Sequence, residues 1–270
     1  ETFQIESEYS VLFGLGTPLL GTDLNPKIWQ VDKSTNLVSE IEFNGTPVLH
    51  PFASWPYFGS GSISRVKTLG TDHLALSSEL WKYENNHFIR QSDLPFSLYK
   101  AVAFKTEGKL FVIGGQNTNR QYENRIYQYT EATDQWQIVA TTPISIDSDL
   151  PNFSYQDKSY IIDTTGLVYQ FSATDLSWSI ITKYPSGTGR RGIACVIKDN
   201  VYVGVYLNRN DVWQYNISRN KWIQKRGLRG DFRNVNLAYW NFEGNIYLLR
   251  GKLGSDPVNN LLIEFKPDDF

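Results

Sequence analysis

The sequence predicts an all-β fold built from six repeated units, and two observations lead to that prediction. The first is a four-residue apolar and aromatic motif, whose clearest copies lie at residues 126–129, 168–171 and 212–215. The second is a tryptophan seven residues after the last aromatic of each copy, which gives the pairs Tyr129 and Trp136, Phe171 and Trp178, and Tyr215 and Trp222. Weaker copies of the motif lie at residues 28–31, 80–83 and 262–265.

The spacing of the six copies indicates the architecture. Successive copies lie 42 to 52 residues apart, with a mean of about 47. A period of this size in a strand-rich chain is typical of a β-propeller, in which each repeat forms one blade of four antiparallel strands. Since a single repeat cannot bury its own faces, the six repeats are expected to close into a ring. The sequence therefore predicts one domain over residues 1–270, a six-bladed propeller.

Short polar turns define the strands within each repeat. In the fifth repeat, the apolar run 193–197 is followed by Asp199-Asn200 and by a second apolar run at 201–203. Gly, Asn and Asp between apolar runs are the local signal for a hairpin. The aromatic motif then supplies the third strand, and the segment with the tryptophan supplies the fourth. The same order predicts turns at Glu107-Gly108, Gln156-Asp157 and Gly244-Asn245.

Two parts of the chain fit the repeat less well. The second repeat has Gly59-Ser60-Gly61-Ser62 where an apolar strand is expected, so its inner strands are weakly defined. The last repeat has no segment for an outer strand. Either residues 2–5 supply that strand, or they form the innermost strand of the first repeat and the last repeat keeps three strands. The second alternative is favoured, because residues 3–5 and 9–13 flank a polar turn as in the other hairpins.

The chain resembles the kelch-repeat propeller family. The third repeat carries its full pattern, with an apolar run at 110–113, then Gly114-Gly115, Tyr127 and Trp136. The fifth repeat is similar to bacterial kelch blades at 189–194, although only the third repeat keeps the paired glycines. The resemblance implies a six-bladed kelch-type β-propeller. Its degenerate repeats look like those of bacterial cell-surface or periplasmic kelch proteins, which implies a periplasmic, surface or secreted location, with the cytoplasm as the alternative.

Composition and motifs exclude several classes of function. A formal net charge of −2 gives no overall case for nucleic acid binding. The longest stretch without charged residues, 43–64, contains three prolines, so no membrane-spanning segment is expected. The single cysteine, Cys195, lies in an apolar strand and is expected to be a buried thiol. No catalytic motif is present, and three scattered histidines predict no metal site and no cofactor. We expect a monomer.

Candidate binding residues lie in the loops between blades and between second and third strands, which open on one face of a propeller. Residues 183–233 carry 11 Lys or Arg against three Asp, and an arginine fork suits a carboxylate, sulfate or phosphate. The predicted ligand-binding residues are Arg190, Arg191, Arg209, Arg226, Arg229, Arg233, Tyr122, Asp163 and Asp211. A structural role is the alternative, since kelch blades use an arginine at the position of Arg190 or Arg191 to pair between blades.

The sequence therefore predicts a non-catalytic binding module that recognises a glycan, in particular an acidic one, or a protein partner through this loop face. One alternative is a sugar-modifying enzyme of the sialic-acid mutarotase type, which kelch propellers include. Arginine would then clamp the sugar carboxylate, and Asp163, Asp211 or Asp231 would move the proton. A second alternative is a protein-interaction scaffold with a broad, flat face.

Overall fold

The computed structural model divides into two compact units, Glu1–Asp147 (unit 1) and Ser148–Phe270 (unit 2), both built of antiparallel sheets. The prediction of a single closed domain stays a prediction, and each unit is described by itself. The residues described by the structure are 3–6, 10–14, 28–32, 35, 37–41, 65–68, 73–76, 78–84, 87–98, 100–106, 109–117, 119–187, 189, 192–206, 209–229, 234–252 and 261–267.

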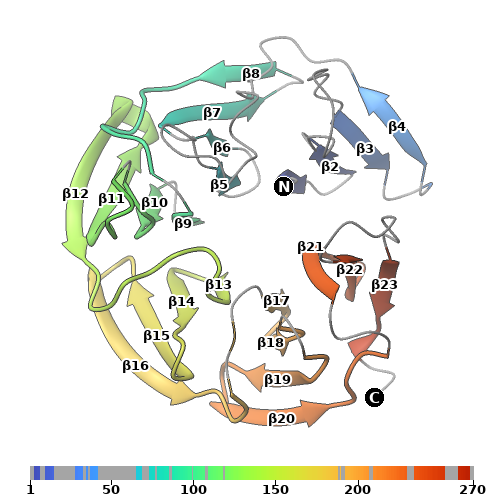
Figure 1. The fold of residues 1–270 in the computed structure, drawn as a ribbon. Coiled ribbons are helices and arrows are strands. Elements are labelled where there is room, and N and C mark those ends of the chain that lie inside the picture. The colour runs from blue at the N-terminus through green and yellow to red at the C-terminus, as the bar shows by residue number, and fades with distance from the viewer. Residues whose placement is uncertain are drawn as a thin grey trace. The chain divides into compact units, whose positions relative to one another are not determined.

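Unit 1 contains three four-stranded sheets (Figure 1). Sheet 1 consists of β1 (Phe3–Glu6), β2 (Ser10–Gly14), β3 (Ile28–Asp32) and β4 (Val38–Ile41). Sheet 2 consists of β5 (Arg65–Thr68), β6 (His73–Leu76), β7 (Glu79–Glu84) and β8 (His87–Arg90). Sheet 3 consists of β9 (Val102–Thr106), β10 (Lys109–Ile113), β11 (Arg125–Thr130) and β12 (Gln135–Thr141), with the short 3-10 helix η2 (Glu131–Thr133) before β12.

Unit 2 contains two four-stranded sheets and, within its described residues, one sheet of three strands. Sheet 4 consists of β13 (Asn152–Tyr155), β14 (Lys158–Ile162), β15 (Leu167–Ser172) and β16 (Ser177–Lys183). Sheet 5 consists of β17 (Ile193–Ile197), β18 (Asn200–Gly204), β19 (Val212–Asn216) and β20 (Lys221–Lys225). Sheet 6 consists of β21 (Asn234–Phe242), β22 (Asn245–Lys252) and β23 (Leu261–Phe265).

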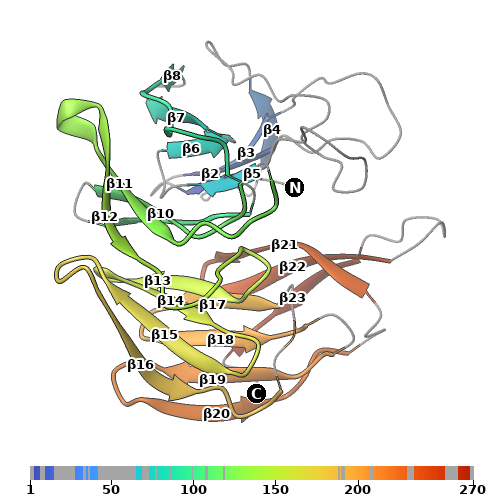
Figure 2. The ribbon, with the colours of Figure 1, turned by 60° about the vertical axis from the view of Figure 1, so that its left-hand side comes forward.

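The strands follow one another in chain order across every sheet, as expected for up-and-down blades. Within unit 1 the first strands β1, β5 and β9 contact in sequence, and within unit 2 so do β13, β17 and β21. In Figure 2, β16 and β20 lie at the opposite, outer edge of their sheets. The four-stranded antiparallel repeat is therefore confirmed, whereas closure of six blades into a ring is not tested by the arrangement within either unit.

The N-terminal segment belongs to the first sheet. Phe3–Glu6 pairs with Ser10–Gly14, so β1 is the edge strand of sheet 1, and sheet 6 has three strands in its described part. This confirms the favoured alternative for the N-terminal segment. In the second repeat, the first strand is Arg65–Thr68, and the glycine-serine segment 59–62 lies outside the described residues.

Turn positions agree with the prediction to within one residue. The turn of sheet 4 is Gln156 and Asp157, as predicted, whereas that of sheet 5 is Lys198 and Asp199, because Asn200 already pairs with Ile197. The turn of sheet 6 is likewise shifted, to residues 243–244. The predicted turn at 107–108 lies outside the described residues.

The repeated aromatic and tryptophan residues form cross-strand pairs. Tyr129 pairs with Trp136, and Tyr215 with Trp222, with ring centroids 5.1 and 4.6 Å apart. Phe171 and Trp178 pair in the same way in sheet 4. Each pair closes the hairpin of the third and fourth strands and buries the first aromatic completely. The spacing of seven residues between the aromatic and the tryptophan is therefore set by the length of the hairpin that joins the third and fourth strands.

The tryptophans also join neighbouring sheets of one unit. The indole Nε1 of Trp136 donates to the carbonyl oxygen of Ser92, at the end of sheet 2, over 2.8 Å. In unit 2 the Nε1 of Trp222 donates to Oγ1 of Thr182 in sheet 4 over 3.2 Å. Tryptophan suits this position because its apolar ring can pack on one sheet while its single N–H group donates a hydrogen bond to the next sheet. The repeated tryptophan is therefore a structural link between sheets.

The core matches the apolar pattern of the strands. Cys195 is buried at 6% exposure in an apolar cluster of unit 2, as predicted. No helix in the described part of the chain has the length and apolar character needed to cross a membrane.

Candidate functional site

Two loops of unit 2 meet at Arg209. The first, 184–192, joins β16 to β17, and the second, 205–211, joins β18 to β19. The Arg209 guanidinium forks onto Asp211, with Nε 2.8 Å from Oδ1 and Nη2 3.0 Å from Oδ2. It also donates to the carbonyl oxygen of Gly187 and to Oγ of Ser186. One arginine thus ties a loop between sheets to a loop within sheet 5. We call Arg209 and Asp211 the loop clamp.

Two buried tyrosines lie beside the loop clamp. Tyr184 is 2% exposed and Tyr206 fully buried, with their rings edge to face at 5.9 Å. The Tyr184 hydroxyl donates to Oδ2 of Asp211 over 3.3 Å. Burial, followed by neighbouring charge, raises the pKa of both hydroxyls, so both are protonated at neutral pH. The Tyr206 hydroxyl has no hydrogen-bond partner among the described residues.

The glycines that gave the fifth repeat its family resemblance pack against Tyr206. A Cβ on Gly192 would lie 2.5 Å from Cε1 of Tyr206, and one on Gly189 would lie 3.2 Å from its Cβ. Contacts this close leave no room for a side chain at Gly192. The two glycines therefore permit the loop to approach the tyrosine ring. Arg190 and Arg191, between them, lie outside the described residues, as does Arg233.

The segment 226–229, which follows β20, is fixed to the loop clamp through its backbone. The amide of Leu228 donates to the carbonyl oxygen of Asn210 over 2.8 Å, and the Leu228 side chain packs on the core of sheets 5 and 6. A Cβ on Gly227 would lie 2.8 Å from the same Asn210 oxygen, so glycine allows this close approach. Arg226 and Arg229, on either side, are exposed. We call residues 226–229 the arginine loop.

The remaining predicted residues have local roles. Oδ1 of Asp163 accepts from the amides of Thr165 and Leu167 at 2.8 and 2.9 Å, and from the Thr165 hydroxyl. Asp163 therefore shapes its own loop between β14 and β15. In unit 1, Tyr122 is 39% exposed, and its hydroxyl donates over 3.0 Å to Oδ2 of Asp147, which is 2% exposed. The structure thus joins Arg209, Asp211 and the arginine loop in unit 2, whereas Tyr122 belongs to unit 1.

Unit 1 contains a counterpart of the loop clamp with the charges exchanged. Arg125 and Asp211 occupy equivalent positions, because each directly precedes an apolar residue of the third strand of its sheet. These two residues, Ile126 and Val212, each pair with the last residue of the second strand. Glu123 and Arg209 lie two residues before Arg125 and Asp211, respectively. The Arg125 guanidinium forks onto Glu123 at 2.7 and 2.6 Å. Sequence reasoning missed this pair. Its signal is two opposite charges, two residues apart, at the start of a third strand.

Electrostatics of the Glu123 pair indicate a structural role. Glu123 is only 7% exposed, and the hydrogen bonds from Arg125 lower the pKa of its carboxyl. The Arg125 guanidinium also lies over the ring of Phe96, 4.9 Å from its centroid. The same position thus holds an ion pair of either polarity in sheets 3 and 5. No group of three His, Cys, Asp or Glu in the described residues could hold a metal ion.

Comparison with known proteins identifies one repeat. The family model of the kelch motif matches residues 101–143, which include all of sheet 3. No curated protein matches the chain. The kelch motif and the sheets of four antiparallel strands are consistent with a kelch-repeat propeller. The kelch motif also suggests a protein-interaction or binding module in general.

Proposed function

We propose that the chain is a non-catalytic binding module whose arginine loop contacts an anionic partner, either an acidic glycan or an acidic protein surface. The observation that carries this proposal is the fixed backbone of the arginine loop. Leu228 and Gly227 dock on Asn210, while Arg226 and Arg229 stay exposed on either side.

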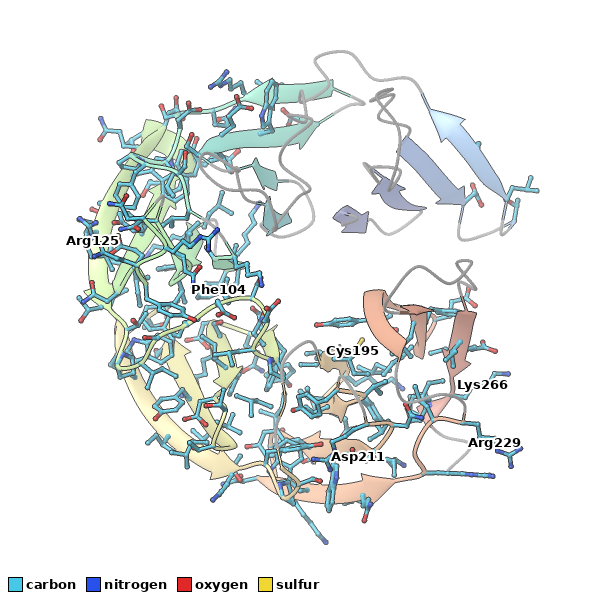
Figure 3. All side chains as sticks on the ribbon, viewed as in Figure 1. Phe104, Arg125, Cys195, Asp211, Arg229 and Lys266 are labelled. Atoms are coloured by element: carbon cyan, nitrogen blue, oxygen red, sulfur yellow. The ribbon has the colours of Figure 1, made fainter. Side chains whose placement is uncertain are left out.

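A fixed loop favours binding because its ordering cost is met during folding and not on association. Figure 3 shows Arg229 on the outer side of unit 2, away from the neighbouring strands. The surrounding sequence adds charge of the same sign. Residues 212–229 contain five Lys or Arg and no Asp or Glu. Such a field attracts anions over a distance of about 8–10 Å at ordinary salt.

Arg209 supports this site indirectly. Its fork is already filled by Asp211, and its other donors reach Ser186 and Gly187. In this arrangement it positions Asn210, the residue on which the arginine loop docks. The proposal therefore assigns ligand contact to Arg226 and Arg229, and loop positioning to Arg209 and Asp211.

The same contacts weigh against the enzymatic alternative. A mutarotase of the proposed type needs an unengaged acid or base beside a sugar carboxylate. Asp211 is held by Arg209 and Tyr184, and Asp163 by its own loop. The third candidate, Asp231, lies outside the described residues. Binding without catalysis is the function that these contacts favour.

An array of acidic glycans and acidic peptides, probed at low and physiological salt, tests the proposal. The wild-type domain should bind anionic members more strongly at low salt, and the double variant Arg226→Ala with Arg229→Ala should lose most of that signal. The matched control, Lys158→Gln with Lys198→Asn, removes two positive charges near the turn of β13 and β14 and the turn of β17 and β18. Equal loss in both double variants, or no anionic binding at all, would contradict the proposal.

A further inference from the structure

β20 is the outer edge strand of sheet 5, and it differs from the outer strands of sheets 3 and 4. The pairing of β12 with β11 and of β16 with β15 is interrupted by an irregularity in register. β20 pairs with β19 regularly, from Val212 and Lys225 to Asn216 and Lys221. Bulges protect edge strands by twisting them away from further pairing. β20 is thus a regular edge without that protection.

The side chains of β20 give this edge a distinct chemistry. Lys221, Ile223 and Lys225 alternate along the strand and so share one face. Ile223 is 45% exposed between the two lysines, and Arg219 lies in the turn just before the strand. Lys221 and Arg219 form no ion pair with a carboxylate among the described residues. The edge therefore combines an exposed apolar centre with positive ends.

The opposite face of β20 holds the strand in place. Trp222 stacks on Tyr215 and bonds to Thr182, which fixes the middle of β20 between sheets 4 and 5. An edge strand fixed in this way presents its outward amide and carbonyl groups in a constant geometry. Because β20 is already ordered, the domain loses less conformational entropy when an added strand pairs with its main chain.

We propose that β20 accepts an acidic, extended segment of a partner protein as a fifth strand of sheet 5. This inference rests on the proposed function, since it names the class of the anionic partner. Alternate acidic side chains of the segment would lie beside Lys221 and Lys225, with an apolar side chain beside Ile223. The segment would cover the five residues of β20, about 17 Å, and its continuation would reach the arginine loop, which directly follows the strand.

Charge decides between an acidic segment and a second copy of the chain. Two β20 strands placed side by side would oppose lysine to lysine, which is unfavourable for cross-strand neighbours. Lysines on an edge strand hinder such self-pairing. An acidic strand converts the same contacts into attraction. A glycan would satisfy the charges but could not supply alternating amide and carbonyl groups in register with the edge, which is why a peptide is favoured.

The experiment uses three ten-residue peptides and two readouts. In the first probe glutamate and valine alternate at every second residue with threonine between them, so that both lie on the face of Lys221, Ile223 and Lys225. The second probe has lysine in place of glutamate, and the third has proline in place of threonine, which removes amide donors. Fluorescence anisotropy measures affinity, and hydrogen exchange of the whole domain measures protection of the β20 amides. The glutamate-valine peptide should bind at least about tenfold more tightly than either other probe and should protect alternate amides of β20.

Three double variants separate the strand from the loop. Lys221→Glu with Lys225→Glu should weaken binding about tenfold by reversing two cross-strand contacts. Arg226→Ala with Arg229→Ala should weaken it through the loop alone while leaving the exchange pattern of β20. As the control, Ile180→Ser with Lys183→Glu alters the corresponding edge strand β16, where Ile180 is 57% exposed, and should not change affinity.

The outcomes distinguish the inference from the proposed function. Loss in both the strand and loop variants, with alternate protection in β20, supports both. Loss in the loop variant alone, or binding of acidic glycans without the peptide, overturns the fifth strand and leaves the proposed function standing. Failure of every anionic probe to bind overturns both. If the glutamate-valine peptide binds without protecting β20, the inference is wrong.

Discussion

Asp134 provides a sharp test of how neighbouring sheets of unit 1 are joined. Its carboxylate lies in the turn between β11 and β12, where its φ of 52° is left-handed. Oδ1 accepts from the Tyr129 hydroxyl at 2.7 Å and from the Ser92 amide at 2.8 Å. Oδ2 accepts from the Ser92 hydroxyl at 2.9 Å. Since Ser92 follows sheet 2, one side chain fixes the end of that sheet to sheet 3.

The structure predicts a ranked series at this position. Asp134→Asn keeps the shape and can keep all three bonds, because the Ser92 hydroxyl can accept as well as donate, so it should cost under about 1 kcal/mol. Asn220, at the corresponding turn of sheet 5, already accepts from Tyr215 over 3.1 Å. Asp134→Gly loses the three bonds but tolerates the left-handed backbone. Asp134→Ala loses the bonds and adds strain, for a total of about 2–3 kcal/mol after discounting for exposure.

Urea unfolding and hydrogen exchange measure this series. The free energy of unfolding should fall in the order Asp, Asn, Gly, Ala, and the Ser92 amide should lose protection in the Gly and Ala variants. Asp93→Ala is the control, because Asp93 is exposed and, among the described residues, its carboxylate bonds Arg90 three positions away, so the change should cost less than about 0.5 kcal/mol. An alanine variant as stable as asparagine, or more stable than glycine, would refute the reasoning.

Two further predictions concern the clamps and their surroundings. Gly192→Ala should destabilise unit 2 by about 1–3 kcal/mol, because its Cβ would lie 2.5 Å from Cε1 of Tyr206; urea unfolding measures this, and an unchanged midpoint would show that the loop can move aside. Glu123→Gln should flatten the acid side of the stability profile. The hydrogen bonds from Arg125 lower the pKa of Glu123 below its ordinary 4.5, so its stabilisation is complete above that value and is lost as the pH falls through the lowered pKa. Urea midpoints at neutral and acid pH check this, and equal acid sensitivity of wild type and variant would contradict it.

Much of the strand architecture follows from the sequence alone, because strand pairing depends on local periodicity. The spacing of Tyr129 and Trp136 predicts a hairpin, and the two residues pair directly in it. The turn of sheet 5 is displaced by one residue because a polar residue such as Asn200 is equally acceptable as the last turn position or the first strand position. Closure of the six repeats depends on long-range contacts that periodicity does not encode, and it stays a prediction, as do the monomeric state and the extracytoplasmic location.

The candidate site was less predictable. The excess of positive charge in 183–233 indicates an unusual sector, but it gives the same weight to every arginine. Arg209 donates to Asp211 because the path of the loop brings the two side chains to the same side. In a loop, a separation of two residues does not determine whether two side chains meet, so the sequence could not predict this ion pair. The arginine loop differs from it because the partly buried Leu228 packs its side chain on the core and its amide bonds Asn210, while the flanking arginines lie at the surface.

The most direct test of the central claim is the salt dependence of binding to the strongest anionic hit, measured for wild type, for Arg226→Ala with Arg229→Ala, and for Lys158→Gln with Lys198→Asn. If the arginine loop makes the contacts, the loop variant should bind at least about tenfold more weakly at low salt and should show a shallower salt dependence, since two charged contacts are lost. The control should follow the wild type. Indistinguishable curves for the loop variant and the wild type would contradict the account.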